Sequence, residues 1–331
     1  MKKSLLALAV LGAFAGAASA QSSVTLYGRV DLSVGKNAGS DAKFMANGSG
    51  SRVGLRGVED LGGGLQALFN IEHRFDADTG QAQNLNVAGL TPTGTTAASI
   101  NNNRFWSARS IVGLQGGFGQ VVLGREYTTA FLGSQLVADP WGWDTIAAST
   151  GTVALTGLGI AKVRNDSSLT YKFSASGFSF GAQVAEATDA INNFRSKPFN
   201  FSAGYAGGPI ALHLGYEKTG REAVATEKMT GFGGSYNLGV VKLGAYVARG
   251  TTLANVTNKS WMLTGVAPIG AGEFRAAFGR LKSGTVTANQ TFAVGYHYSL
   301  SKRTTLYGDI ANNSKLSTSK SAYDIGLKHN F

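Results

Sequence analysis

Apolar and polar residues alternate along most of this chain, in segments of about ten residues separated by stretches rich in Gly, Asn, Ser and Thr. In the segment 24–34 the even positions read Val, Leu, Gly, Val, Leu, Val, whereas the odd positions read Thr, Tyr, Arg, Asp, Ser. A period of two predicts β-strands, because successive side chains of a strand point to opposite faces. The same alternation recurs at 65–72, 178–184, 199–205, 210–217, 241–247, 292–298 and 323–331.

Alternation alone fits a soluble β-sandwich as well as a transmembrane barrel, so further features must separate the two. Aromatic residues lie near the ends of these segments, as in the girdle of a membrane barrel: Tyr216, Tyr298 and Phe331 on the apolar faces, and Tyr27 at an odd position of its segment. Compact, mostly Gly-rich turns at 59–64, 116–119, 206–209 and 299–303 alternate with long polar loops expected at 76–103, 126–161, 219–227 and 251–258. This arrangement predicts an all-β, single-domain transmembrane barrel.

The first twenty residues have the pattern of a secretory leader. Lys2 and Lys3 precede an uncharged apolar run of 14 residues, 5–18, and Ala18-Ser19-Ala20 fits a signal-peptidase site. The run is too short for a comfortable transmembrane helix. A buried N-terminal helix is the alternative. We expect a cleaved signal peptide at 1–20 and a mature barrel at 21–331.

Composition and charge exclude several classes of function. The chain has no cysteine, so it has no disulfide scaffold, thiolate metal site or cysteine nucleophile. Its four histidines are isolated from one another, and no metal or cofactor site is expected. The net charge of +11 falls to +9 without Lys2 and Lys3. These charges are scattered, which argues against nucleic-acid binding and permits a basic cavity.

One motif of catalytic type occurs in the chain. Residues 177–181 read Gly-Phe-Ser-Phe-Gly, which matches the nucleophile pattern of many hydrolases. That motif requires a turn into a helix, whereas Phe178 and Phe180 continue an alternating strand. We expect no catalysis through Ser179 and no enzymatic activity.

The order and spacing of several short motifs carry a family resemblance. They are SVTLYG at 23–28, SRVGLRGVEDLGGGLQA at 51–67, VGL at 112–114, FG at 118–119, LGR at 123–125, YSLSKRT at 298–304 and GLKHNF at 326–331. Together they resemble the trimeric general porins of Gram-negative β-proteobacteria, of the Neisseria, Bordetella, Comamonas and Burkholderia kind. The resemblance covers the whole chain.

This resemblance implies a 16-stranded antiparallel barrel of the outer membrane, whose third long loop, 126–161, folds inward as a constriction. It implies a homotrimer embedded in lipid and lipopolysaccharide, which passes small ions and hydrophilic solutes. It also implies that barrel-assembly machinery reads the last strand and Phe331; the alternative is a strand that merely ends in an aromatic residue. The middle of the loop departs from the family pattern, with ADPWGWD at 138–144 and few acids.

Strand parity selects basic residues for the wet face. Because Val53 and Leu55 point outward, Arg52 and Arg56 should point inward, and the same argument applies to three further arginines: Arg29, Arg109 and Arg164. Three acids of the loop are expected to face them: Glu126, Asp139 and Asp144. Arg125 has the outward parity, and only a bulge or strand end would turn it inward.

Such arginines suit a pore because a guanidinium stays charged at any relevant pH, and rings of basic side chains favour anions. The alternative is that each arginine only pairs with a neighbouring carboxylate. We expect a passive diffusion channel that favours anions. An outer-membrane enzyme would need a clustered catalytic set. A ligand-specific channel or adhesin would use aromatic-rich loops, for which Trp141 and Trp143 are the hint.

Overall fold

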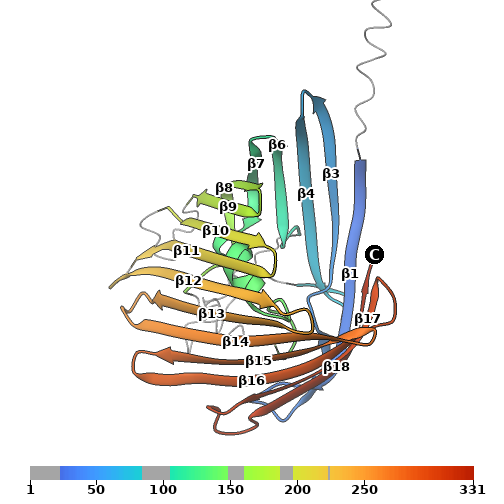
Figure 1. The fold of residues 1–331 in the computed structure, drawn as a ribbon, viewed down its shortest axis with the longest axis vertical. Helices are drawn as coiled ribbons and strands as arrows, with labels where there is room; N and C mark the ends of the chain where they lie inside the picture. The colour runs from blue at the N-terminus through green and yellow to red at the C-terminus, as the bar shows by residue number, and fades with distance from the viewer. Residues whose placement is uncertain (1–22, 84–104, 148–159, 187–196, 223) are drawn as a thin grey trace, which may run out of the picture.

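The computed structural model describes residues 23–83, 105–147, 160–186, 197–222 and 224–331, which form one antiparallel sheet closed into a barrel (Figure 1). Eighteen strands occur in these ranges, of which two are short: β2 (Lys43–Asn47) and β5 (Gln81–Ala82). The sixteen long strands are β1 (Ser23–Lys36), β3 (Arg52–Gly62), β4 (Leu65–Asp76), β6 (Arg109–Gly116), β7 (Gly119–Tyr127), β8 (Arg164–Ala175), β9 (Phe178–Ala185), β10 (Phe199–Gly207), β11 (Ile210–Glu222), β12 (Thr226–Asn237), β13 (Lys242–Thr251), β14 (Thr257–Ile269), β15 (Gly272–Ser283), β16 (Val286–Ser299), β17 (Thr304–Asn313) and β18 (Ser321–Asn330).

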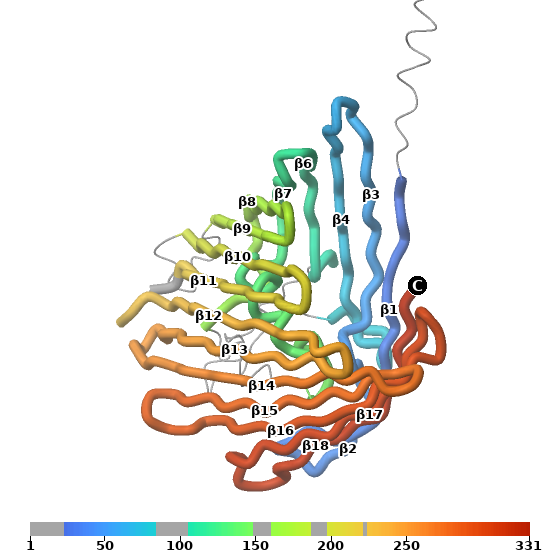
Figure 2. Tube along the Cα trace, in the orientation of Figure 1, coloured from blue at the N-terminus to red at the C-terminus, as the bar shows by residue number. Residues whose placement is uncertain are grey.

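The barrel closes because the last strand pairs with the first. Each long strand is antiparallel to the next, and β18 pairs with β1 from Arg29↔Asn330 to Lys36↔Tyr323. The other edge of β1 pairs with β3, from Ser23↔Val58 to Arg29↔Arg52. Figure 2 shows the C-terminus beside β1. The predicted sixteen-stranded antiparallel barrel is therefore confirmed.

Apolar side chains of the strands face outward and polar side chains face inward, the reverse of a soluble protein. In β18, Ile325 is 61% exposed, whereas Asp324 beside it is 1% exposed. The neighbouring outward positions of this strand, Tyr323 and Leu327, are also exposed apolar side chains. This alternation is the one that a strand between lipid and a wet lumen requires.

None of the helices in the described ranges is long and apolar enough to cross a membrane.

β7 and β8 are connected by residues 128–163, which we call the inward loop, and its described parts, 128–147 and 160–163, lie inside the barrel. Its described part contains one π-helical turn, Phe131–Gln135, followed by a 3₁₀ turn, Leu136–Ala138. The backbone N–H of Thr129 donates to Asn200 Oδ1 of β10 at 2.8 Å. The contacts of the π-helical turn continue across β11 and β12, so the loop lies against the lumenal wall (Figure 1).

Two further hydrogen bonds attach the inward loop to the wall at other strands. The backbone N–H of Lys162 donates to Glu217 Oε1 of β11 at 3.0 Å. The indole N–H of Trp141 donates to Asp309 Oδ1 of β17 at 2.8 Å. Gly215 of β11 permits the close approach of the first turn, because a Cβ there would overlap Ser134. The loop is thus held from both sides of the lumen.

Candidate functional site: a cationic cavity beside the inward loop

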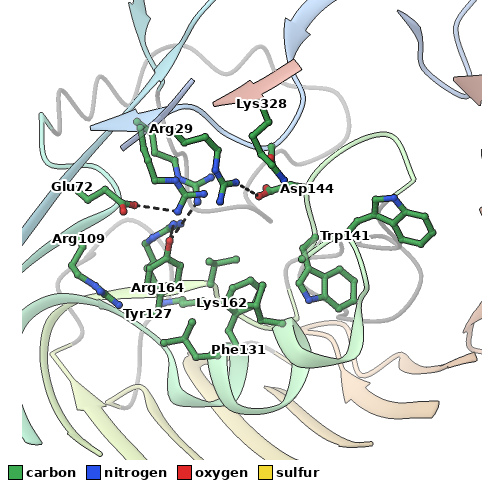
Figure 3. Close-up of a pocket in the computed structure, with 18 of the residues that line it drawn as sticks. Arg29, Glu72, Arg109, Tyr127, Phe131, Trp141, Asp144, Lys162, Arg164 and Lys328 are labelled. Carbon is green, nitrogen blue, oxygen red and sulfur yellow. Dashed lines mark hydrogen bonds and ion pairs between the residues drawn. The ribbon is translucent and has the colours of Figure 1, made fainter. Parts of the chain in front are cut away.

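A cavity of about 720 Å³ lies between the inward loop and the strands that face it (Figure 3). Among the described residues its lining holds nine basic side chains and two acidic ones, Glu72 and Asp144. The basic side chains are Arg29, Arg52, Arg74, Arg109, Arg125, Arg164, Arg275, Lys162 and Lys328. All but Lys162 come from strands, β1, β3, β4, β6, β7, β8, β15 and β18, so the rigid barrel positions this charge.

Tyr127, the last residue of β7, organises the centre of the basic wall. Arg164 Nη2 donates to the Tyr127 hydroxyl at 2.5 Å, and Arg74 Nη2 lies 3.4 Å from the same oxygen. The Arg164 and Arg109 guanidinium carbons lie 4.0 Å and 5.2 Å from the centre of its ring. An aromatic face attracts cations, and the phenol oxygen accepts their hydrogen bonds. Tyr127 therefore lets three guanidiniums share one small volume without a carboxylate between them.

Two buried donors of this cluster remain unpaired. Within the described part of the chain, neither Arg74 Nε nor Arg164 Nε has a hydrogen-bond partner. A buried charged donor without a partner is costly, so the cluster concentrates positive charge beside the lumen at the expense of hydrogen bonding. The cluster is therefore suited to meet anions from the lumen.

The two acids of the lining lie beside particular arginines, and three carboxylates outside the lining pair with further ones: Glu126 with Arg109, Asp166 with Arg125 and Glu273 with Arg275. Glu72 Oε1 is 3.7 Å from Arg52 Nη1, and the second carboxylate oxygen of Glu72 accepts a hydrogen bond from Tyr27 at 3.1 Å. Asp144 of the inward loop lies 3.8 Å from Arg29 Nη1. Both distances are long for a direct ion pair, so the lining keeps a positive excess.

Five of the residues selected by sequence come together in this cavity: Arg29, Arg52, Arg109, Arg164 and Asp144. Three others do not belong to its lining. Arg56 is exposed, with its guanidinium 5.2 Å from the centre of the Tyr27 ring. Glu126 is buried and accepts from Arg109 Nη2 at 2.8 Å and from Lys172 Nζ at 3.2 Å. Asp139 is buried and accepts the backbone N–H of Trp141.

Five basic residues of the lining were not selected from the sequence: Arg74, Arg125, Lys162, Arg275 and Lys328. Arg74 and Lys328 share the parity of inward residues on their own strands. Extending the alternation to the ends of these strands would therefore have predicted both to point inward. Arg125 follows a register shift between β7 and β8, at Gly124 with a φ of +120°. Its guanidinium bonds Asp166 Oδ1 at 2.5 Å and the Ser107 carbonyl at 2.7 Å. The bulge, which parity cannot reveal, turns Arg125 inward.

Phe331 lies at the seam of the barrel. Its backbone N–H donates to the Gly28 carbonyl at 3.1 Å, and its own carbonyl accepts the Gly28 N–H at 3.0 Å. The ring lies over Gly28, where a Cβ would overlap it. The terminal residue therefore extends the pairing of β18 with β1.

The family model described as "Gram-negative porin" matches residues 7–316 of this chain. An outer membrane porin protein of Bordetella pertussis is 32% identical, with 100% of both chains covered. Outer membrane porin protein 32 of Delftia acidovorans is 33% identical over 94% of this chain and 89% of that protein.

Solved structures show the same fold. The anion-selective porin from Comamonas acidovorans superposes with a TM-score of 0.72 at 25% identity, covering 94% of this chain and 100% of that one. The trimer form of Vibrio cholerae OmpT has a TM-score of 0.65 at 14% identity, covering 94% and 99% of the two chains.

Proposed function

Because this chain belongs to the Gram-negative porin family, it is a passive diffusion channel of the outer membrane and not an enzyme, and we propose that its channel favours anions. One observation carries the proposal: among the described residues, nine basic side chains and two acidic ones line the cavity beside the inward loop. Fixed charge of one sign in a narrow passage raises the local concentration of the opposite ion.

The residues act in different ways in this proposal. Arg29, Arg52, Arg109 and Arg164 form the anion-attracting wall together with Arg74, and Asp144 faces them from the loop. Arg56 extends the basic face along β3, outside the cavity. Two acids act indirectly: Glu126 fixes the Arg109 guanidinium, and Asp139 shapes the turn before Trp141. The name of the Comamonas acidovorans porin, a structural relative, supports the anion preference.

The test is a reversal potential in a potassium chloride gradient across a planar bilayer that contains the refolded protein. A reversal potential close to the equilibrium potential of chloride is expected. One close to that of potassium would overturn the anion preference. Absence of conductance steps would count against a functional channel in this preparation of the chain.

The proposal also includes a homotrimer. The trimer form of the Vibrio cholerae relative, which has the same fold, supports it. Unheated protein in mild detergent should sediment as three chains. Sedimentation as a single chain, with the barrel still folded by circular dichroism, would overturn the homotrimer.

Export by a leader completes the proposal, although residues 1–20 lie outside the described part of the chain. The sequence pattern of 1–20 supports cleavage after Ala20, which leaves the barrel at 21–331. N-terminal sequencing of the membrane form should begin at Gln21. A first residue of Met1 would overturn the cleavage.

A further inference from the structure

The two sides of the cavity differ in chemistry, and the side formed by the inward loop is largely apolar. The loop contributes seven apolar side chains to the lining, Val163 and six from its first part: Phe131, Leu132, Leu136, Pro140, Trp141 and Trp143. In Figure 3, Phe131 lies across the cavity from Arg29. The loop's acid in the lining, Asp144, lies close to Arg29 rather than on this apolar side. An anion in the cavity therefore meets guanidiniums on the strand side, and on the loop side it meets mostly hydrocarbon together with the basic Lys162.

The polar atoms of the two tryptophans are turned to the interior of the loop and wall. The Trp141 indole N–H donates to Asp309, and the Trp143 indole N–H donates to the Gln135 carbonyl at 2.6 Å. Both donors are thus occupied, and both rings are held in place by their hydrogen bonds. What remains for the cavity is the apolar surface of these rings and of the partly exposed Leu132 and Leu136. Contact between this surface and an apolar solute lowers the free energy, because both lose water from apolar area. Contact with a hydrated solute gives no such gain.

We infer that, among the anions that pass, this cavity selects monocarboxylates with an apolar aliphatic or aromatic body over equally large hydroxylated ones. The inference rests on the proposed anion preference and names the class of solute. A carboxylate is attracted to the guanidiniums of the strand side in either case. Only the apolar body also covers the leucines, whereas a hydroxylated body would lose water there without gaining a partner.

Benzoate and threonate provide a matched pair, since they have equal numbers of non-hydrogen atoms and one negative charge at neutral pH. Each potassium salt is placed opposite potassium chloride across a bilayer, and the reversal potential gives its permeability relative to chloride. Covering the apolar surface of even one methylene corresponds to about a fourfold preference. We expect benzoate to exceed threonate by at least about fourfold beyond their ratio of diffusion coefficients in water.

The variant Leu132→Ser/Leu136→Ser removes part of the apolar surface of the cavity and should lower this ratio toward the diffusion ratio. Val137→Ser is the matched control, because Val137 is 57% exposed on the same turn and does not line the cavity. The control should keep the wild-type ratio.

Two results overturn the inference. A wild-type ratio equal to the diffusion ratio shows that the apolar side does not select. An unchanged ratio in the double leucine variant shows that the selection arises elsewhere. In both cases chloride preference over potassium, measured separately in the wild type, tells whether the proposed function still stands.

Discussion

Replacing Glu126 by Gln tests whether buried charge pairing holds the basic wall in place. The Glu126 side chain is 1% exposed, and its carboxylate accepts from Arg109, Lys172 and the backbone N–H of Tyr127, the last at 2.7 Å. Removing one partner of a fully buried pair costs about 3–5 kcal/mol. Here Arg109 and Lys172 are 24% and 29% exposed, so water can hydrate them in part. Gln also retains an acceptor. We therefore expect a loss of about 2 kcal/mol in the free energy of unfolding.

The assay is urea unfolding of the protein in lipid vesicles, followed by tryptophan fluorescence. Glu186→Gln is the control, because the Glu186–Lys197 pair has a short distance of 2.6 Å but exposed side chains, 61% and 68%. An exposed pair typically contributes about 0.2–1 kcal/mol. If the two variants lose the same stability, burial of Glu126 does not matter and the reasoning is refuted.

Three further changes follow from the same structure. Tyr127→Phe removes the oxygen that accepts from Arg164 and should lower the free energy of unfolding by about 1.5 kcal/mol in urea. An unchanged free energy of unfolding would contradict the role given to this hydroxyl. Trp141→Phe leaves Asp309 without the indole donor and should increase open-channel current noise; noise equal to wild type would argue that this bond does not hold the loop. Deleting Phe331 should lower the amount inserted in the outer membrane, measured by fractionation, and unchanged levels would count against an assembly role.

The barrel could be predicted because the alternation of apolar and polar residues that produces it is a local property of the sequence. A strand between lipid and lumen must alternate apolar and polar residues. The outward direction of Ile325 and the inward direction of Asp324 can therefore be predicted without knowing which strands lie beside them. Two of the long loops, 219–227 and 251–258, were predicted too long. β11 continues to Glu222 and β12 begins at Thr226, and β14 begins at Thr257, because the hairpin strands extend beyond the apolar band. Polar composition alone does not distinguish a loop from such a strand extension.

The cavity was predictable only in part. Parity is enough to place Arg52 and Arg164 toward the lumen, where both line the cavity. It could not indicate that Glu126 would pair with Arg109 and Lys172, because ion pairs depend on neighbouring strands and their register. The apolar character of the inward loop was visible as Trp141 and Trp143, yet its position opposite the arginines depends on how the loop folds back.

The most direct test of the central claim compares the chloride-to-potassium permeability ratio of the wild type with that of Arg74→Gln/Arg164→Gln. A unit charge about 7 Å from a passing ion attracts an anion and repels a cation by about 0.6 kcal/mol each in water, so each removed charge should lower the ratio by about 7-fold. The account predicts chloride preference in the wild type and a clear reduction in the double variant. Potassium preference in the wild type, or an unchanged ratio in a folded double variant, would contradict it.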